Sequence, residues 1–489
     1  MEDIKPIYLK ELHKYTVDDF KNRLHGNAKD KEREINLLIS NNLLKRVAGS
    51  NDEEASSDEL NSPVQGNEKF LALKYVGLII TQHNIICAYP KYIMQETDTL
   101  STHFQKVLNV IKRLNRRELK LTLSNDVSDS SKLPLLSIIL EIIHQYMENG
   151  IYIKNEQIQE LNGDGEINWE RTIGETEALI IKKKPFYPNM YTEYNQWNEN
   201  DYFHRLHQCI IAECYQYITS TEISKMLNIH GGMKLDKKLR DFGSRKVIIQ
   251  KLKKELKNQF VTWKKIAIRL MIAYLNKAGE KQERHSIVYY GTNDLNITWE
   301  KACAVVLGNQ MEMAISNIDV LDDNFKNAYN ETLGSIIEKP IWLACGASSE
   351  NAQKADTLIP DTVVIQKNKD NALQLVIYDA KYYNINLTSK KVSGQPGIES
   401  ITKQYLYHLA YKDFMEKANI HDVENVFLFP TMGESKELGS VTLNFLEKAC
   451  NLIPIKAIML NTDTVWNLFL ENKQVTLNNL LANTSDSTF

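Results

Sequence analysis

The sequence predicts a multi-domain α/β protein, with a mixed sheet flanked by helices in its C-terminal part and with N-terminal α+β and helical regions. First, its 489 residues suffice for about two to four domains of ordinary size. Second, residues 359–365 and 373–381 are runs of β-branched and aliphatic residues, typical of buried strands, and the polar residues 367–371 between them indicate a hairpin turn. Third, strand-like and helix-like segments alternate from residue 290 onward, which favours helices packed on a sheet.

The organisation along the chain follows from shifts in composition. We expect a small helical or winged-helix-like module in residues 1–48, with a helical docking arm as the alternative, and then a polar linker in residues 49–67. Residues 68–160 begin with strands of a hairpin, residues 161–289 are predicted to be mainly helical and basic, and residues 290–489 to form the α/β domain. The periodicity predicts helices around residues 101–118, 133–148, 201–218 and 245–278.

The charge of the chain is unevenly distributed. The formal net charge is −3, but from Lys234 to Arg284 there are 16 Lys and Arg residues against 5 Asp and Glu residues, a net of +11. A basic segment in an otherwise acidic chain is what contact with phosphate groups requires. A solvated helical bundle has the same composition, so both interpretations stay open.

The cysteine pattern and the hydropathy of the chain indicate the cellular compartment in which we expect the protein. The six cysteines form no Cys-x-x-Cys pair, and the N-terminus lacks the pattern of a signal peptide. No apolar run reaches the roughly 18–20 residues that a membrane-spanning helix needs. We therefore expect a cytoplasmic protein with reduced cysteines, without a zinc site and without contact with a membrane.

Two carboxylates and a lysine stand at the ends of the predicted hairpin strands. Asp361 begins the first strand and Asp379 ends the second, so a hairpin places them side by side. Side chains alternate along a strand, so Asp379 and Lys381 share a face and Ala380 points away from it. Two carboxylates about 4–6 Å apart repel each other unless a cation joins them. The pattern predicts a site for Mg²⁺ that acts on a phosphate, with an edge hairpin bearing a surface salt bridge as the alternative.

These residues resemble the signature of the PD-(D/E)XK nuclease superfamily. The resemblance implies that Asp361, Asp379, Ala380 and Glu300 hold Mg²⁺, with Mn²⁺ as a substitute, and that Lys381 orients the attacking water or holds the scissile phosphate. Superfamily members often carry such an acidic residue on the helix before the core sheet. A glutamate favoured by the dipole at a helix N-terminus is the alternative interpretation of Glu300.

A further catalytic candidate lies in the helix predicted downstream of the hairpin. Gln404 follows a loop that contains Gly394 and Gly397. It resembles the glutamine that some superfamily members place beside the active site. An exposed helix position that packs against the sheet is the alternative.

Longer motifs narrow the resemblance. Residues 378–383, 396–398 and 402–407, together with residues 165–173, are similar to motifs of the LlaJI family of restriction endonucleases. That family is similar to McrC, the nuclease subunit that works with a McrB-type GTPase. The resemblance implies a Mg²⁺-dependent endonuclease that cuts double-stranded DNA in defence against foreign or phage DNA, together with a McrB-like AAA+ GTPase.

The sequence lacks a nucleotide-binding motif, which indicates what a partner subunit would have to supply. The sequence contains no Gly-x-x-x-x-Gly-Lys-Ser/Thr motif, so any step driven by GTP or ATP belongs to another subunit. Residues 1–160 carry no recognisable catalytic set, and we expect them to dock the partner or, alternatively, to read DNA. A free-standing type II endonuclease and a non-cleaving DNA-targeting subunit are the two other hypotheses. Dimerisation for double-strand cleavage is consistent with either endonuclease.

Overall fold

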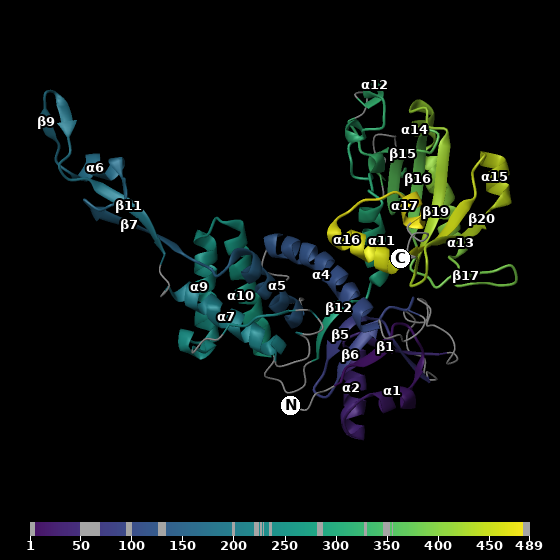
Figure 1. Ribbon diagram of the computed structural model, residues 1–489, viewed down its shortest axis with the longest axis horizontal. Helices are drawn as coiled ribbons and strands as arrows, with labels where there is room; N and C mark the ends of the chain where they lie inside the picture. The colour runs from purple at the N-terminus through teal and green to yellow at the C-terminus, as the bar shows by residue number, and fades with distance from the viewer. Residues whose placement is uncertain are drawn as a thin grey trace, which may run out of the picture. The chain divides into compact units, whose positions relative to one another are not determined.

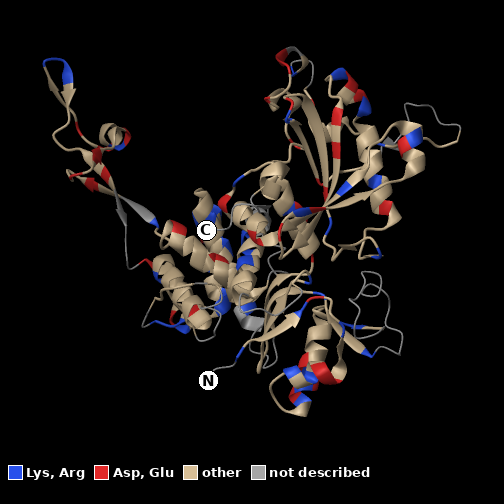
Figure 2. Cartoon of the chain, turned by 45° about the vertical axis from the view of Figure 1, so that its right-hand side comes forward, with Lys and Arg blue, Asp and Glu red and all other residues tan. Residues whose placement is uncertain are grey.

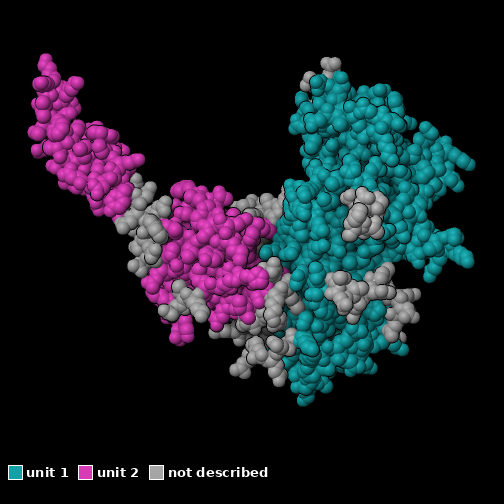
Figure 3. All heavy atoms as spheres, in the orientation of Figure 1, with its two compact units in different colours: residues 1–115, 290–489 teal, residues 116–289 magenta. Residues whose placement is uncertain are grey.

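The computed structural model divides the chain into two compact units. Met1–Asn115 and Tyr290–Phe489 form the first unit, and Arg116–Tyr289 forms the second (Figures 1 and 3). The structure describes residues 5–48, 69–93, 100–125, 134–197, 201–219, 224, 227, 229–233, 237–280, 287–326, 330–345, 353–354 and 356–482.

A five-stranded mixed sheet forms the C-terminal part of the first unit, so the predicted α/β fold class is confirmed. Its strand order is β15-β16-β19-β21-β20. The outer strands β15 and β20 run antiparallel to their neighbours, and the three inner strands run parallel to one another. The strands are β15 (Thr362–Lys367), β16 (Leu373–Ala380), β19 (Asp422–Thr431), β21 (Ile455–Asn461) and β20 (Lys436–Val441).

The turn between β15 and β16 is the hairpin turn that the sequence predicts. The side-chain oxygen of Asn368 accepts hydrogen bonds from the backbone N–H groups of Asp370 and Ala372, both at 3.0 Å. Asn371 has a φ of 61°, a left-handed conformation that asparagine tolerates better than most residues. These features end β15 and reverse the chain, which sets the register of the two strands.

Alternation along β15 and β16 buries one row of apolar side chains against helices α13 (Ile398–Ala410) and α14 (Lys412–Lys417). Each such valine, leucine or isoleucine contributes about 1.5–3 kcal/mol when it is fully buried. The row and its helical partners include Val363, Ile365, Leu375, Ile377, Tyr411, Phe414 and Met415.

Helix α11 (Leu295–Val306) is anchored to the same sheet by tryptophan. The rings of Trp299 and Trp466 meet edge to face, 5.4 Å apart, which joins α11 to helix α16 (Thr462–Glu471). The indole N–H of Trp299 donates a hydrogen bond to the carbonyl group of Leu428 in β19. The position of α11, which carries Glu300, is therefore set by buried contacts.

The N-terminal part of the first unit contains two small sheets. Strands β1 (Ile7–Lys10), β6 (Ile85–Tyr89), β5 (Val76–Ile80) and β12 (Val288–Thr292) form one sheet in that order. Strands β2 (Tyr15–Thr16), β4 (Phe70–Leu73) and β3 (Leu44–Val47) form the other, beside α1 (Val17–Arg23) and α2 (Ala28–Ser40).

Strand β12 joins this N-terminal part to α11, because it lies next to β5 and is followed almost directly by the helix. The two strands approach closely at two glycines. A Cβ atom on Gly291 would lie 2.1 Å from the carbonyl oxygen of Val76, and one on Gly77 would lie 2.3 Å from that of Tyr290. Only glycine fits at this contact.

The compact units differ from the predicted division in several places. Strand β3 pairs with β4, which lies beyond the predicted linker, so residues 1–48 are not a separate helical module. Residues 1–115 belong to the same unit as the predicted 290–489 domain, and residues 116–160 belong to the other unit. Local composition does not reveal such pairing between distant segments. The predicted linker, residues 49–67, lies outside the described residues.

The second unit contains the predicted helices and an arm of strands. The helices are α5 (Leu135–Asn149), α7 (Tyr202–Thr219), α9 (Arg245–Asn258) and α10 (Thr262–Glu280), and α4 (Leu100–Asn125) spans the boundary between the units. The predicted helix 245–278 is interrupted at Gln259, whose side-chain oxygen accepts the backbone N–H groups of Phe260 and Val261. The helices predicted near 101–118, 133–148 and 201–218 are confirmed.

Residues 155–197 form the arm, and all of it from residue 161 onward lies in the region that was predicted to be mainly helical. In Figure 1 the arm is elongated and ends in the hairpin of β9 and β10, and Figure 2 shows basic residues at the tip of that hairpin. Its elements are β7 (Asn155–Leu161), β8 (Glu166–Ile167), α6 (Trp169–Glu175), β9 (Leu179–Ile181), β10 (Lys184–Phe186) and β11 (Tyr191–Trp197).

Shorter elements complete the description. No helix of the described residues is both long enough and apolar enough to cross a membrane. The remaining elements are η2 (Leu239–Phe242), η3 (Ile315–Asn317), α12 (Asp323–Lys326), η4 (Leu333–Ile336), β13 (Ile341–Trp342), β14 (Gln353–Lys354), β17 (Asn386–Leu387), β18 (Val392–Ser393), α15 (Asn444–Cys450) and α17 (Leu477–Ala482).

Candidate active site

Asp361 and Asp379 face each other at one end of the β15–β16 hairpin. The antiparallel register pairs Thr362 with Tyr378, and one step further it sets Asp361 opposite Asp379. Oδ2 of Asp361 accepts a hydrogen bond from the backbone N–H of Ala380 at 2.9 Å. Asp379 is buried, with 4% of its surface exposed. The hairpin therefore brings together the two carboxylates that the sequence singles out.

The environment of Asp361 disfavours its ionised form. Burial, followed by the charge of Asp379 and a hydrogen bond to it, raises the pKa of Asp361 from 3.8 to about 8. The charge of Glu300 acts in the same direction, whereas the N–H group of Ala380 acts against it. This end of the hairpin consequently holds more negative charge than the protein alone neutralises.

Lys381 supplies one positive charge at this point. Its Nζ lies 2.8 Å from Oδ2 of Asp379, and its side chain is about one-fifth exposed, at 21%. Its backbone N–H donates a hydrogen bond to the carbonyl group of Leu428, which ties the residue to β19. The ion pair places Lys381 beside Asp379, as alternation along the strand predicts.

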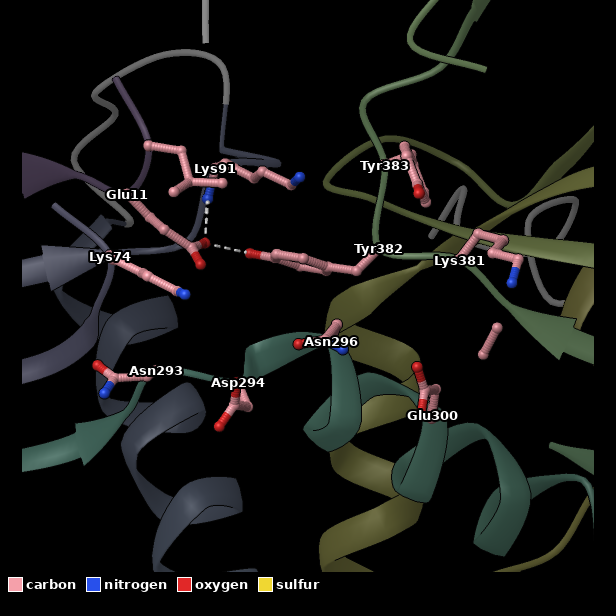
Figure 4. A pocket seen from close by; sticks show the side chains of 12 residues that line it. Glu11, Lys74, Lys91, Asn293, Asp294, Asn296, Glu300, Lys381, Tyr382 and Tyr383 are labelled. Atoms are coloured by element: carbon pink, nitrogen blue, oxygen red, sulfur yellow. Dashed lines mark hydrogen bonds between the residues drawn. The ribbon is translucent and has the colours of Figure 1, made fainter. Parts of the chain in front are cut away.

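Glu300 approaches this group from α11. Burial, followed by the charge of Asp379, raises the pKa of Glu300, and the charge of Lys381 acts in the opposite direction. Glu300 lies with Ala380 and Lys381 in the wall of one cavity (Figure 4). The helix therefore brings its acidic residue to the end of the hairpin.

Gln404 lies against β16, the strand that contains Asp379. It is fully buried, and its Nε2 donates a hydrogen bond at 2.9 Å to the carbonyl group of Ile377, two residues before Asp379. Its Oε1 atom has no hydrogen-bond partner among the described residues. The side chain is thus placed against the backbone of β16, because the helix turns this position toward the sheet. The exposed position of the alternative interpretation is wrong.

Two residues that the sequence analysis did not single out also belong to the surroundings of the site. Asn309 donates from Nδ2 to the carbonyl group of Asp361 and accepts the N–H of Val363, so it fixes the start of β15. Burial and then the charges of the site carboxylates raise the pKa of Tyr407. Tyr407 follows Gln404 by three positions in α13, so helical periodicity was an available signal for it. The loop around Asn309 carries no comparable signal.

The carboxylates are the kind of donor that a hard divalent cation prefers. Among the residues that the structure describes, no group of three or more His, Cys, Asp or Glu side chains is arranged to hold a metal ion. Asp379 is instead paired with Lys381, and Asp361 with the N–H of Ala380. Burial, and after it the charge of Asp379, raises the pKa of both Asp361 and Glu300. A divalent cation held between these carboxylates would stabilise their ionised forms, so the residues fit such an ion.

Comparison with known proteins defines the class to which this fold and site belong. Residues 75–463 match the LlaJI restriction endonuclease family, and the chain belongs to that family. It is 28% identical over 467 residues to the Type II restriction enzyme BsuMI component YdjA of Bacillus subtilis (strain 168), which covers 92% of this chain and 89% of that protein.

Two solved structures show distant similarity. One is a chain of the refined half-complex from the tetradecameric assembly of Thermococcus gammatolerans McrB AAA+ hexamers with bound McrC, at 13% identity and a TM-score of 0.38, covering 97% of this chain and 100% of that chain. The other belongs to the Thermococcus gammatolerans McrBC complex, at 12% identity and a TM-score of 0.25, covering 61% of this chain and 86% of that chain.

Proposed function

We propose that this chain is a Mg²⁺-dependent DNA endonuclease subunit of a restriction system, built on a PD-(D/E)XK core. The observation that carries the proposal is the register that sets Asp361 opposite Asp379, with Nζ of Lys381 2.8 Å from Asp379. Membership of a restriction endonuclease family supports a DNA phosphodiester as the substrate. The six free cysteines are consistent with action in the cytoplasm.

The proposed site assigns a role to each residue. The groups that would hold the ion are the carboxylates of Asp361, Asp379 and Glu300 and the backbone carbonyl group of Ala380. When bound, Mg²⁺ lowers the pKa of a coordinated water and offsets the charge that develops on the phosphate. Lys381 orients the water or binds a phosphate oxygen, and the water attacks phosphorus in line with the leaving 3′ oxygen.

A plasmid assay tests the reaction class. The chain, purified together with any subunit that accompanies it from its own cells, should nick or cut supercoiled plasmid in Mg²⁺ and should be inactive in EDTA. Activity that persists in EDTA would exclude the metal-dependent mechanism. Robust site-specific cleavage by the isolated chain without nucleotide would favour a free-standing type II enzyme.

We further propose that a McrB-like GTPase subunit docks on the arm formed by residues 155–197. Large apolar side chains there are exposed to an unusual degree, and clusters of this kind mark protein–protein contacts. At the β9–β10 hairpin, Ile180 is 71% exposed and Lys182 and Lys183 form the turn. The exposed group consists of Leu161, Trp169, Ile173, Leu179, Ile180, Ile181 and Phe186.

The proposed docking surface, residues 155–197, differs from the region expected from sequence, residues 1–160, and overlaps it only at residues 155–160. Residues 1–115 pack into the same unit as the catalytic sheet, so deleting residues 1–160 would remove part of that unit's core. A substitution on the arm is a cleaner test. Ile180→Asp should abolish co-purification of the partner, whereas the control Ile341→Asp, at a position 66% exposed in β13, should not. If the partner co-purifies equally well with Ile180→Asp and with Ile341→Asp, the docking surface lies outside the arm.

A further inference from the structure

We propose that a cavity at the end of the catalytic hairpin binds one nucleotide of the cleaved DNA strand, directly beside the scissile phosphate. The proposal rests on the proposed nuclease function and adds a binding site to it. The cavity has a volume of about 310 Å³, and ligand pockets range from about 300 to 1,000 Å³. That space accommodates a single nucleotide.

The cavity is continuous with the catalytic residues. Ala380, Lys381 and Glu300 line it from the catalytic side, and Lys74 and Lys91 line it from the N-terminal part of the same unit. Figure 4 shows Lys74 and Lys91 on one side and Lys381 and Glu300 on the other, with the start of α11 between them. A nucleotide in this cavity therefore lies next to a phosphate held at Lys381.

One wall is suited to a phosphate group. Nζ of Lys91 lies over the rings of Tyr382 and Tyr383, at 4.9 and 5.6 Å from their centres. A cation–π contact positions the ammonium group without cancelling its charge. The nearby carboxylate of Glu11 is directed into the wall, because it accepts hydrogen bonds from the hydroxyl of Tyr382 and the backbone N–H of Lys91.

The other wall is suited to a base. Asn293 and Asp294, which directly precede α11, and Asn296 in its first turn present two amides and a carboxylate. Such groups hydrogen-bond to the polar edges of bases. Across the cavity, in the wall that holds Lys91, Tyr383 is 39% exposed, and its ring offers a surface on which the same base can stack. Cationic groups on one wall and hydrogen-bonding groups on the other match the two ends of a nucleotide.

Salt-dependent DNA binding tests the phosphate contact. Affinity of the full chain for a fluorescein-labelled duplex, measured by anisotropy in EDTA, reports binding without cleavage. Lys91→Ala should weaken binding several-fold and reduce the log–log salt slope by about 0.9, the value for one phosphate contact. Lys91→Arg should retain the slope, and Lys369→Ala, a control at an exposed position in the hairpin turn, should leave both quantities unchanged.

Two substitutions of Tyr383 test the base contact. Tyr383→Ala should weaken binding several-fold without changing the salt slope, and Tyr383→Phe, which keeps the ring, should bind like the wild type. Thermal unfolding verifies that each variant is folded. Unchanged affinity and slope in folded Lys91→Ala and Tyr383→Ala would overturn the cavity assignment. If plasmid cleavage persisted in that case, the nuclease function would stand without the cavity.

DNA binding at the cavity without any cleavage would also distinguish the two proposals. In that case Lys91→Ala reduces the salt slope, but the wild-type chain never cleaves DNA, even with its partner. This pair of results would support the nucleotide site and reject the nuclease function. Photo-crosslinking of a 5-bromodeoxyuridine oligonucleotide supplies a second readout. Crosslinks should fall on the peptide that contains Tyr383, and crosslinks confined to other peptides would contradict the proposal.

Discussion

The hydroxyl group of Tyr382 donates a hydrogen bond to the carboxylate of Glu11 across 2.6 Å, although the two residues are 371 positions apart in the chain. Both side chains are buried. Tyr382 directly follows Lys381, and Glu11 follows strand β1. The N-terminal part of the chain therefore helps to fix the backbone that carries the catalytic lysine.

Tyr382→Phe removes the donor and leaves Glu11 with fewer partners. We expect a loss of about 1–3 kcal/mol in the free energy of unfolding, as for a buried polar group left unsatisfied. Because Lys381 is then held less firmly, kcat should fall several-fold while KM for DNA stays nearly constant. Tyr405→Phe is the matched control, since Tyr405 donates to Glu447 away from the site. A Tyr382→Phe enzyme with wild-type kcat would show that the contact is only structural.

Asp379→Ala should abolish cleavage and leave DNA affinity within a few-fold of wild type, or raise it. The substitution removes a metal ligand, but it also removes a negative charge that repels phosphate. Lys381→Ala should likewise abolish cleavage while metal binding persists. Anisotropy in Ca²⁺ measures the affinity, and calorimetric titration measures the metal. Loss of metal binding in Lys381→Ala would contradict its assigned role.

The raised pKa of Asp361 predicts how stability varies with pH. In the folded chain the neutral carboxyl is favoured, so its contribution is complete below the unfolded pKa of about 3.9 and is lost progressively as the pH rises to about 8. In metal-free buffer, the unfolding temperature of wild type should thus fall more steeply from pH 5 to 8 than that of Asp361→Asn. Mg²⁺ requires the ionised form, so its stabilising effect should grow over the same range. Parallel curves for the two proteins would refute this prediction.

The basic helix α9 provides a test of DNA contact in the second unit. Lys251, Lys253 and Lys254 are exposed, and their combined replacement by Glu should flatten the log–log salt slope, by about 0.9 for each phosphate contact that is lost. If the helices only solvate a bundle, the slope will not change. An equal change of charge at the exposed lysines 369, 412 and 448 of the first unit serves as the control.

The central carboxylates were predictable because their geometry is local. A hairpin of apolar strands with a polar turn determines which residues face each other, so Asp361 and Asp379 could be paired from the sequence. Glu300, in contrast, was expected only through the family resemblance, and the structure places it in the second turn of α11.

The remaining features depend on distant segments. Gln404 could not be assigned from its helix alone, because its orientation toward Ile377 follows from how α13 packs on the sheet. The pairing of β3 with β4 and the contact between Glu11 and Tyr382 join segments with no shared local pattern. The strands of the arm were not predicted within the mainly helical region 161–289, because these short strands lack a strong apolar alternation.

Single-turnover cleavage of a labelled DNA duplex tests the central claim most directly. Wild type, Asp379→Ala and the control Asp370→Ala, which alters an exposed turn residue of the same hairpin, are compared in Mg²⁺ with the accompanying subunit and nucleotide present. We predict full cleavage by wild type and Asp370→Ala, and none by folded Asp379→Ala. Cleavage by Asp379→Ala at the wild-type rate would contradict the assignment of this hairpin as the active site.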